Sequence, residues 1–283
     1  MPRKPTYEEL KNKLKELERQ LADLKEADLT SKDLTAYLSV LAGLRRVSSE
    51  ETEESFLQTF LSEIVKQYGF CMSWYGRYEN GTIRPILSAG KVDQYLDNLV
   101  LDIKESTSPD AVCAISRAIL KEAPFTYGDL ERDEGFRSWR DYAIELGYRS
   151  NLAMPLKVDG HVEGGVMVYA DTPHAFPELR MARLMSLSNE LGALLSERRA
   201  QLKTLKELQE SEENFRALAE KANDGIMIVV GEGVHVYANM RAAEITGYSV
   251  SELSKITIED LALPEELEKT KERYKRIIEG QAL

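Results

Sequence analysis

The sequence predicts an α+β protein, because hairpins and amphipathic helices occur in the same stretches of chain. Asn80-Gly81 and Asp159-Gly160 each separate two apolar, strand-like runs, and both residues of such a turn must reach positive φ. Between these turns, residues 133–146 place apolar side chains at three- and four-residue steps, which is one face of a helix. Strands joined by such tight turns are antiparallel, so the sheet is expected to contain antiparallel pairs.

The composition limits the class of protein. The chain has 283 residues, of which 43% are hydrophobic, and this suggests roughly two domains with packed cores. Its formal net charge of −11 argues against a nucleic-acid partner, because nonspecific binding to phosphates needs a basic face. No apolar run approaches the ~18 residues of a membrane span, and the charged N-terminus lacks the apolar core of a signal peptide. We expect a cytoplasmic protein without direct membrane contact.

The N-terminal segment carries a heptad pattern. Between residues 7 and 27, leucines recur at alternating four- and three-residue steps, with charged residues in most other positions. Such a narrow stripe is typical of a helix paired with another helix. We therefore predict a coiled-coil helix over residues 1–32 and a homodimer; a solvated single helix is the alternative. The expected dimer interface is the leucine seam, made of Leu10, Leu14, Leu17, Leu21 and Leu24.

Two further helices and a strand are predicted before the first hairpin turn. Residues 33–47 place leucines on one side of a helix. The next helix begins at Thr52, whose hydroxyl suits an N-cap, and ends at Gly69, where glycine takes the left-handed conformation without a steric clash. The strand over residues 70–75 is largely apolar on both sides, so we expect both faces of this strand to be covered.

Residues 91–132 give weaker signals. Apolar residues at 99–103 and 124–127 indicate two short strands. Pro109 is expected to begin a helix that runs to Leu120, because proline is favoured in the first helical turn.

The stretch over residues 133–173 is the most informative. Its helix is expected to end at Gly147, and apolar residues then alternate over 152–158 as on a strand with a buried face. This stretch resembles the ligand-sensing core of GAF domains, most closely the subgroup found beside PAS domains in bacterial and archaeal signalling proteins. The matching residues are Trp139-Arg140, Ala143, Gly147-Tyr148-Arg149-Ser150, Pro155-Leu156, Gly165, Val168-Tyr169-Ala170, Pro173 and Ala175-Phe176.

The resemblance implies a GAF domain over residues 33–197, in which an antiparallel sheet is covered by helices on both faces. A long helical pattern follows from residue 177 to about residue 221, and helices much longer than ~25 residues usually indicate a coiled coil or a connector. We therefore expect a signalling helix over residues 198–213.

The last segment, residues 214–283, resembles the first half of a PAS domain. The similar features are Asp224-Gly225-Ile226, the glycine turn at Gly231–Gly233, Tyr237-Ala238-Asn239, Thr246-Gly247-Tyr248-Ser249 and a helix over 264–278. The remaining three strands of a PAS sheet would follow Leu283. We expect a partial PAS domain with an unpaired sheet edge.

The combination implies a noncatalytic sensory module of a signal-transduction protein, as in the sensor histidine kinases of two-component systems. It would bind a small molecule in the GAF pocket and transmit the state through a dimeric helix. Two alternatives keep the fold: a ligand-free GAF domain that serves as a dimerisation spacer, and an enzyme of the free methionine-sulfoxide reductase type. The identity of the ligand, any cofactor and the output domain are left open, and no metal site is expected.

Five residues are candidates for the ligand pocket: Trp74, Cys113, Trp139, Tyr142 and Arg149. Aromatic walls with few polar groups are typical of small-ligand sites, although plain core packing would use the same residues. Arg149 lies just before a buried strand, where an unpaired charge is costly. It either pairs with a carboxylate such as Asp141 or Glu145, or binds an anionic ligand.

Cys113 raises the question of covalent chemistry. In tetrapyrrole-binding GAF domains a cysteine in this region is followed by a histidine, whereas here Ala114 follows. The close cysteine cluster of the sulfoxide reductases is also absent, because Cys71 is the only other cysteine. A small buried side chain is the competing interpretation of Cys113.

Overall fold

The computed structural model of the chain describes residues 13, 16, 30–47, 52–92, 96, 99–103, 113–231 and 233–280, without the side chains of Asp102, Ser138 and Trp139. The chain divides into two compact units, Met1–Ala200 and Gln201–Leu283. All five leucines of the leucine seam lie outside the described residues, as does Pro109, the expected start of the helix in the middle of the chain. No helix in the described part is long and apolar enough to cross a membrane.

The first unit is built on one antiparallel sheet, which confirms the predicted α+β class. Its six strands lie in the order β3-β2-β1-β6-β5-β4, and each neighbouring pair is antiparallel. The strands are β1 (Met72–Glu79), β2 (Thr82–Gly90), β3 (Leu101–Asp102), β4 (Phe125–Tyr127), β5 (Ser150–Val158) and β6 (His161–Ala170).

Both predicted hairpin turns are confirmed. Asn80 and Gly81 have φ of 53° and 88°, and Asp159 and Gly160 have φ of 52° and 80°. Positive φ at both central residues is the geometry of a type I′ turn, whose twist matches that of the flanking strands. The turns therefore fix the β1–β2 and β5–β6 registers, and β1 pairs with β6 to join the two hairpins.

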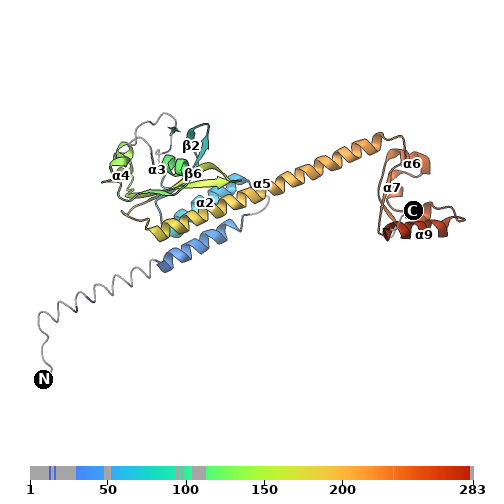
Figure 1. The fold of residues 1–283 in the computed structure, drawn as a ribbon, viewed down its shortest axis with the longest axis horizontal. Helices are drawn as coiled ribbons and strands as arrows, with labels where there is room; N and C mark the ends of the chain where they lie inside the picture. Colours follow the sequence, from blue (N-terminus) through green and yellow to red (C-terminus); the bar gives the residue numbers. More distant parts are fainter. Residues whose placement is uncertain are drawn as a thin grey trace, which may run out of the picture. The chain divides into compact units, whose positions relative to one another are not determined.

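One face of the sheet is covered by α2 (Glu53–Tyr68) and α5 (Glu178–Lys221), with the helix over residues 30–44 packed against them (Figure 1). Thr52 caps α2 by accepting a hydrogen bond from the amide of Ser55. The core here combines alternate residues of β5 and β6 with the apolar faces of the helices. It includes Val40, Leu44, Phe60, Leu61, Ile64, Leu152, Met154, Leu156, Val166, Val168, Leu184, Leu187 and Leu191.

The opposite face is covered by α3 (Ala114–Lys121), the 3-10 helix η2 (Glu134–Trp139) and α4 (Arg140–Glu145). We call it the pocket face. A single helix was expected over residues 133–146, but residues 134–139 wind more tightly, as a 3-10 helix with i→i+3 bonding. The tight winding brings Gly135 against Tyr127, where a Cβ would lie 2.8 Å from the Tyr127 hydroxyl. Gly147 ends the helical segment at φ 85°, as predicted.

The second unit contains the two expected PAS strands, β7 (Met227–Val230) and β8 (Val234–Ala238), followed by α6 (Met240–Thr246), α7 (Val250–Leu253), α8 (Ile258–Leu261) and α9 (Leu267–Ile278). Asn239 holds its first half together. Its Oδ1 accepts hydrogen bonds from the amides of Ile226 and Ala242, and its Nδ2 donates to the carbonyls of Ala219 and Asp224. The buried cluster is small: Ala238, Ala242, Ala243 and Leu253.

Candidate functional site

The candidate site lies on the pocket face, around Trp74 of β1. Its indole is almost completely buried, with 2% of its surface exposed. A cavity of about 20 Å³ adjoins it, lined by Trp74, Leu99, Leu101, Cys113, Ala114, Ile115, Phe136, Met167 and Tyr169. Since one water occupies ~10–15 Å³ by this kind of measure, the cavity as observed has room for about one water molecule.

Two buried nitrogen donors on the pocket face lack a hydrogen-bond partner among the residues that the structure describes. They are Nε1 of Trp74 and Nδ2 of Asn151. Asn151 is fully buried on β5, where its Oδ1 accepts a hydrogen bond of 3.2 Å from the amide of Tyr127. Its cross-strand neighbour is Tyr169, a residue of the cavity wall. Leaving a buried donor unpaired costs ~1–3 kcal/mol. An acceptor atom that bonded to either nitrogen would offset this cost.

Asn151 was not among the residues singled out from the sequence. A signal was available, because the strand sequence NLAMPLKV is apolar apart from its ends, and a polar side chain at its start either reaches solvent or needs a partner. Only the pairing of β4 with β5, which covers this end of the strand, shows that Asn151 is buried.

The structure brings Cys113 to Trp74, because both line the same cavity. Cys113 is half-buried at the N-cap of α3, and its Sγ lies 3.2 Å from Oγ of Ser116. Cys71, which was expected on a buried strand, instead precedes β1 and is half-buried. Burial, with a smaller contribution from Asp171, raises the pKa of the Cys71 thiol. A raised pKa lowers the fraction of thiolate, which is the reactive form.

The structure places Arg149 in an ion pair rather than on the wall of the cavity. Its Nε lies 3.2 Å from Oε1 of Glu131, a carboxylate other than the two suggested by the sequence. Nη1 donates to the carbonyls of Ile144 and Tyr148 at 3.2 and 2.9 Å. These bonds tie the end of α4 to the start of β5.

The other two predicted site residues are not brought to the cavity wall. Tyr142 lies on α4 with 40% of its surface exposed, outside the cavity lining. Trp139 is the last residue of η2, and its side chain is outside the described part of the structure. No group of three or more potential metal ligands occurs among the described residues.

Comparison with known proteins identifies two domain families in the chain. The family model for the GAF domain matches residues 50–196, and the model for the PAS fold matches residues 213–282. Among curated proteins, the probable diguanylate cyclase DgcE of Escherichia coli K12 is 33% identical over 76 residues. That match covers 27% of this chain and 7% of the E. coli protein.

Several solved structures are similar at low sequence identity. The A. aeolicus nlh2 GAF domain in an inactive state is 15% identical with a TM-score of 0.45, covering 61% of this chain and 98% of that one. The free methionine-R-sulfoxide reductase of Neisseria meningitidis, in complex with its substrate, is 17% identical with a TM-score of 0.46, covering 59% and 91%. The GAF domain of an Acinetobacter phosphoenolpyruvate-protein phosphotransferase is 15% identical with a TM-score of 0.45, covering 60% and 97%.

Proposed function

This chain belongs to the GAF domain family and carries a PAS fold in its C-terminal part, and from this premise we propose that it is the noncatalytic sensory module of a signal-transduction protein. The GAF domain, residues 33–197, binds a small molecule on the pocket face. The signalling helix, residues 198–213, pairs with that of a second copy and transmits the bound state along the dimeric helix. The PAS region, residues 214–283, follows it.

The observation that carries the ligand proposal is the pair of unsatisfied donors at Trp74 and Asn151. A ligand with acceptor oxygens or nitrogens would pair with them and offset the cost of burying both groups. A molecule larger than water must also displace part of the cover from Trp74, because the cavity holds only about 20 Å³. Binding would then select a second arrangement of the covering elements, as a sensor requires.

The same small cavity favours a second candidate, the ligand-free dimerisation spacer. Ligand sites usually enclose roughly 300–1,000 Å³, whereas the cavity beside Trp74 encloses about 20 Å³. The side chain of Ile115 packs closely against Gly76 and Gly165 on the sheet. A filled core of this kind needs no ligand to be stable.

Cys71 and Cys113 give little support to a reductase. Burial disfavours the nucleophilic thiolate of Cys71, and Cys113 lies on the cavity wall without a second cysteine among its described lining residues.

Retention of a small molecule tests the ligand proposal. Native mass spectrometry of the full chain, purified from cells without denaturation, is expected to show a bound mass in addition to the protein. Trp74→Phe removes the Nε1–H donor but keeps an aromatic ring, and it should lower the retained fraction at least tenfold. Tyr68→Phe is the matched control, because it removes a buried hydroxyl that has no hydrogen-bond partner among the described residues and packs against the core on the opposite face. Loss of the bound mass from both variants would contradict a specific role for Trp74, and a wild-type protein with no bound mass would support the spacer.

Pairing through the leucine seam is tested separately. Leu14→Lys combined with Leu21→Lys places charges at two seam positions and should convert a dimer to a monomer in sedimentation experiments. The control, Asn12→Lys with Ala22→Lys, adds the same charge at positions outside the heptad seam and should leave the dimer intact. A seam variant that sediments with the wild-type mass would show that these leucines do not hold two chains together.

A further inference from the structure

Three small residues on one side of α5 follow the edge of the hairpin formed by β5 and β6. Ser188 Oγ donates a buried hydrogen bond of 3.0 Å to the carbonyl of Pro155. Gly192 approaches the next carbonyl on the same side of β5, and a Cβ at Gly192 would lie 2.0 Å from the oxygen of Lys157. One helical turn later, the amide of Asp159 donates a 2.8 Å hydrogen bond to Oγ of Ser196.

These contacts advance in step along both elements. Four residues of a helix rise ~6.0 Å, and two residues of a strand rise ~6.6 Å. The helix positions 188 and 192 therefore stay level with the strand positions 155 and 157, and position 196 meets Asp159 in the turn that directly follows β5. Because each pair engages a backbone group of the strand, sliding α5 along β5 would break all three contacts together.

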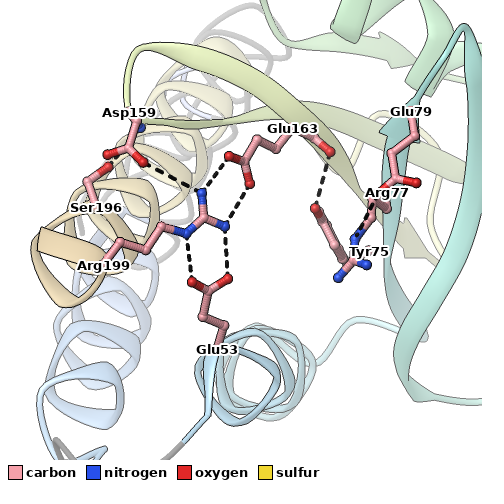
Figure 2. Close-up of polar contacts among 8 residues, drawn as sticks. All are labelled: Glu53, Tyr75, Arg77, Glu79, Asp159, Glu163, Ser196 and Arg199. Carbon is pink, nitrogen blue, oxygen red and sulfur yellow. Dashed lines mark hydrogen bonds and ion pairs between the residues drawn. The ribbon is translucent and has the colours of Figure 1, made fainter. Parts of the chain in front are cut away.

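Arg199 closes this series one turn further along α5 (Figure 2). Its Nε and Nη2 donate to the two carboxylate oxygens of Glu53, at 2.6 and 2.8 Å. Nη1 and Nη2 donate to those of Glu163, at 2.5 and 2.9 Å. Nη1 also lies 3.6 Å from Oδ2 of Asp159. The guanidinium thus joins α5 to the first turn of α2 and to the β5–β6 hairpin through bidentate, charge-assisted bonds.

One carboxylate partner of Arg199, Glu163, is itself held in place. The backbone carbonyl of Glu163 accepts a 3.3 Å hydrogen bond from the hydroxyl of Tyr75 on β1 (Figure 2). The hydrogen bond from Arg199 lowers the pKa of Glu53, consistent with an ionised pair. Along α5, Arg199 is followed by residues 201–218, all of them exposed.

β5 connects this series to the candidate site. Its side chains alternate, so that Leu152, Met154 and Leu156 pack under α2 and α5, while Ala153 packs on the pocket face. Asn151, with its unpaired donor, lies in the same strand. A displacement of β5 driven from the pocket face therefore acts directly on the backbone groups that α5 contacts.

We propose that Ser188, Gly192, Ser196 and Arg199 form a coupling ladder that keeps α5 in register with β5, and that Arg199 is the positioning residue that passes a shift of β5 to the turn where α5 leaves the GAF domain. This inference rests on the proposed sensory function, which supplies the ligand-driven shift of β5. The ladder itself acts in the absence of any ligand.

Hydrogen exchange of the full chain without added ligand tests the ladder. Arg199→Gln removes the charge and the bidentate bonds, and amides of residues 196–203 and 159–163 should exchange at least tenfold faster. Amides of residues 184–191, held by buried leucines, should keep their rates. Arg216→Gln is the matched control, because it breaks an exposed i,i+4 pair with Glu212 in the same helix and should leave residues 196–203 unchanged. Unaltered exchange at 196–203 in Arg199→Gln would overturn the proposal.

A double-mutant comparison tests the transmission. Ala153→Val enlarges a side chain on the pocket face of β5 and should change exchange at residues 196–203 at least threefold when Arg199 is present. It should cause no further change in Arg199→Gln. If the Ala153→Val protein does not fold, Asn151→Ala is used in its place as the change on the pocket face of β5. Equal effects with and without Arg199, or no effect at 196–203, would exclude the ladder as the route.

These results are separable from those of the ligand experiment. If exchange at residues 196–203 responds to Ala153→Val in a protein that retains no molecule, the ladder proposal is supported and the ligand proposal is contradicted. If the protein retains a molecule but exchange at residues 196–203 does not respond, the ligand proposal is supported and the ladder proposal is contradicted.

Discussion

Replacing Asp33 with alanine is expected to lower the free energy of unfolding of the first unit by about 3–5 kcal/mol, because it breaks a buried ion pair and leaves the other charge uncompensated. Asp33 accepts two hydrogen bonds from Arg180 of α5, from Nη2 at 2.7 Å and Nε at 2.8 Å. The two side chains are 9% and 13% exposed. This pair attaches the helix over residues 30–44 to the start of α5.

An ion pair between Arg45, which directly follows that helix, and Glu190 of α5 provides the control. Arg45 lies 3.4 Å from Glu190, and these side chains are 70% and 37% exposed. Arg45→Ala should therefore cost less than ~1 kcal/mol, as exposed pairs usually do. Urea unfolding followed by tryptophan fluorescence reports on the first unit, since both tryptophans belong to it. Asp33→Ala combined with Arg180→Met should recover much of the loss, and equal effects of Asp33→Ala and Arg45→Ala would contradict the assignment.

Gly192→Ala is expected to destabilise the first unit, although glycine inside a helix normally costs ~1 kcal/mol relative to alanine. The added Cβ would lie 2.0 Å from the carbonyl oxygen of Lys157. Backbone atoms cannot rotate away as a side chain can, so α5 or β5 must shift. Overpacking of this kind costs roughly 1–3 kcal/mol, which exceeds the gain in helix propensity.

Gly43→Ala is the matched control for Gly192→Ala. Its Cβ would lie 3.0 Å from Cγ of Glu63, a side chain atom that can move. Here the helix propensity should decide the sign, giving a gain of up to about 1 kcal/mol. Urea unfolding compares the two variants. A Gly192→Ala protein as stable as the wild type would show that the close approach of α5 to β5 is not rigid.

The sequence alone determined the local geometry of this protein. Asn80-Gly81 and Asp159-Gly160 specify tight hairpins, and Gly69 and Gly147 end helices, because these conformations depend on the absence of a Cβ or on a small polar residue at positive φ. Alternating apolar residues assigned the two faces of β5, because side-chain direction in a strand has a period of two. The GAF and PAS regions were identified from the sequence only by its resemblance to those two families, and the family models match residues 50–196 and 213–282.

The pairing of charges and the state of the pocket were decided only by the tertiary structure. Arg149 lies near Asp141 and Glu145 in sequence but pairs with Glu131, because the loop before η2 brings that carboxylate to it. Arg199 pairs with Glu53 across 146 residues of sequence. No local pattern encodes such contacts, since any of many carboxylates could serve a given arginine until the backbone fixes which one is within reach. The unpaired donor of Asn151 has the same origin, because its burial depends on how β4 closes the edge of the sheet.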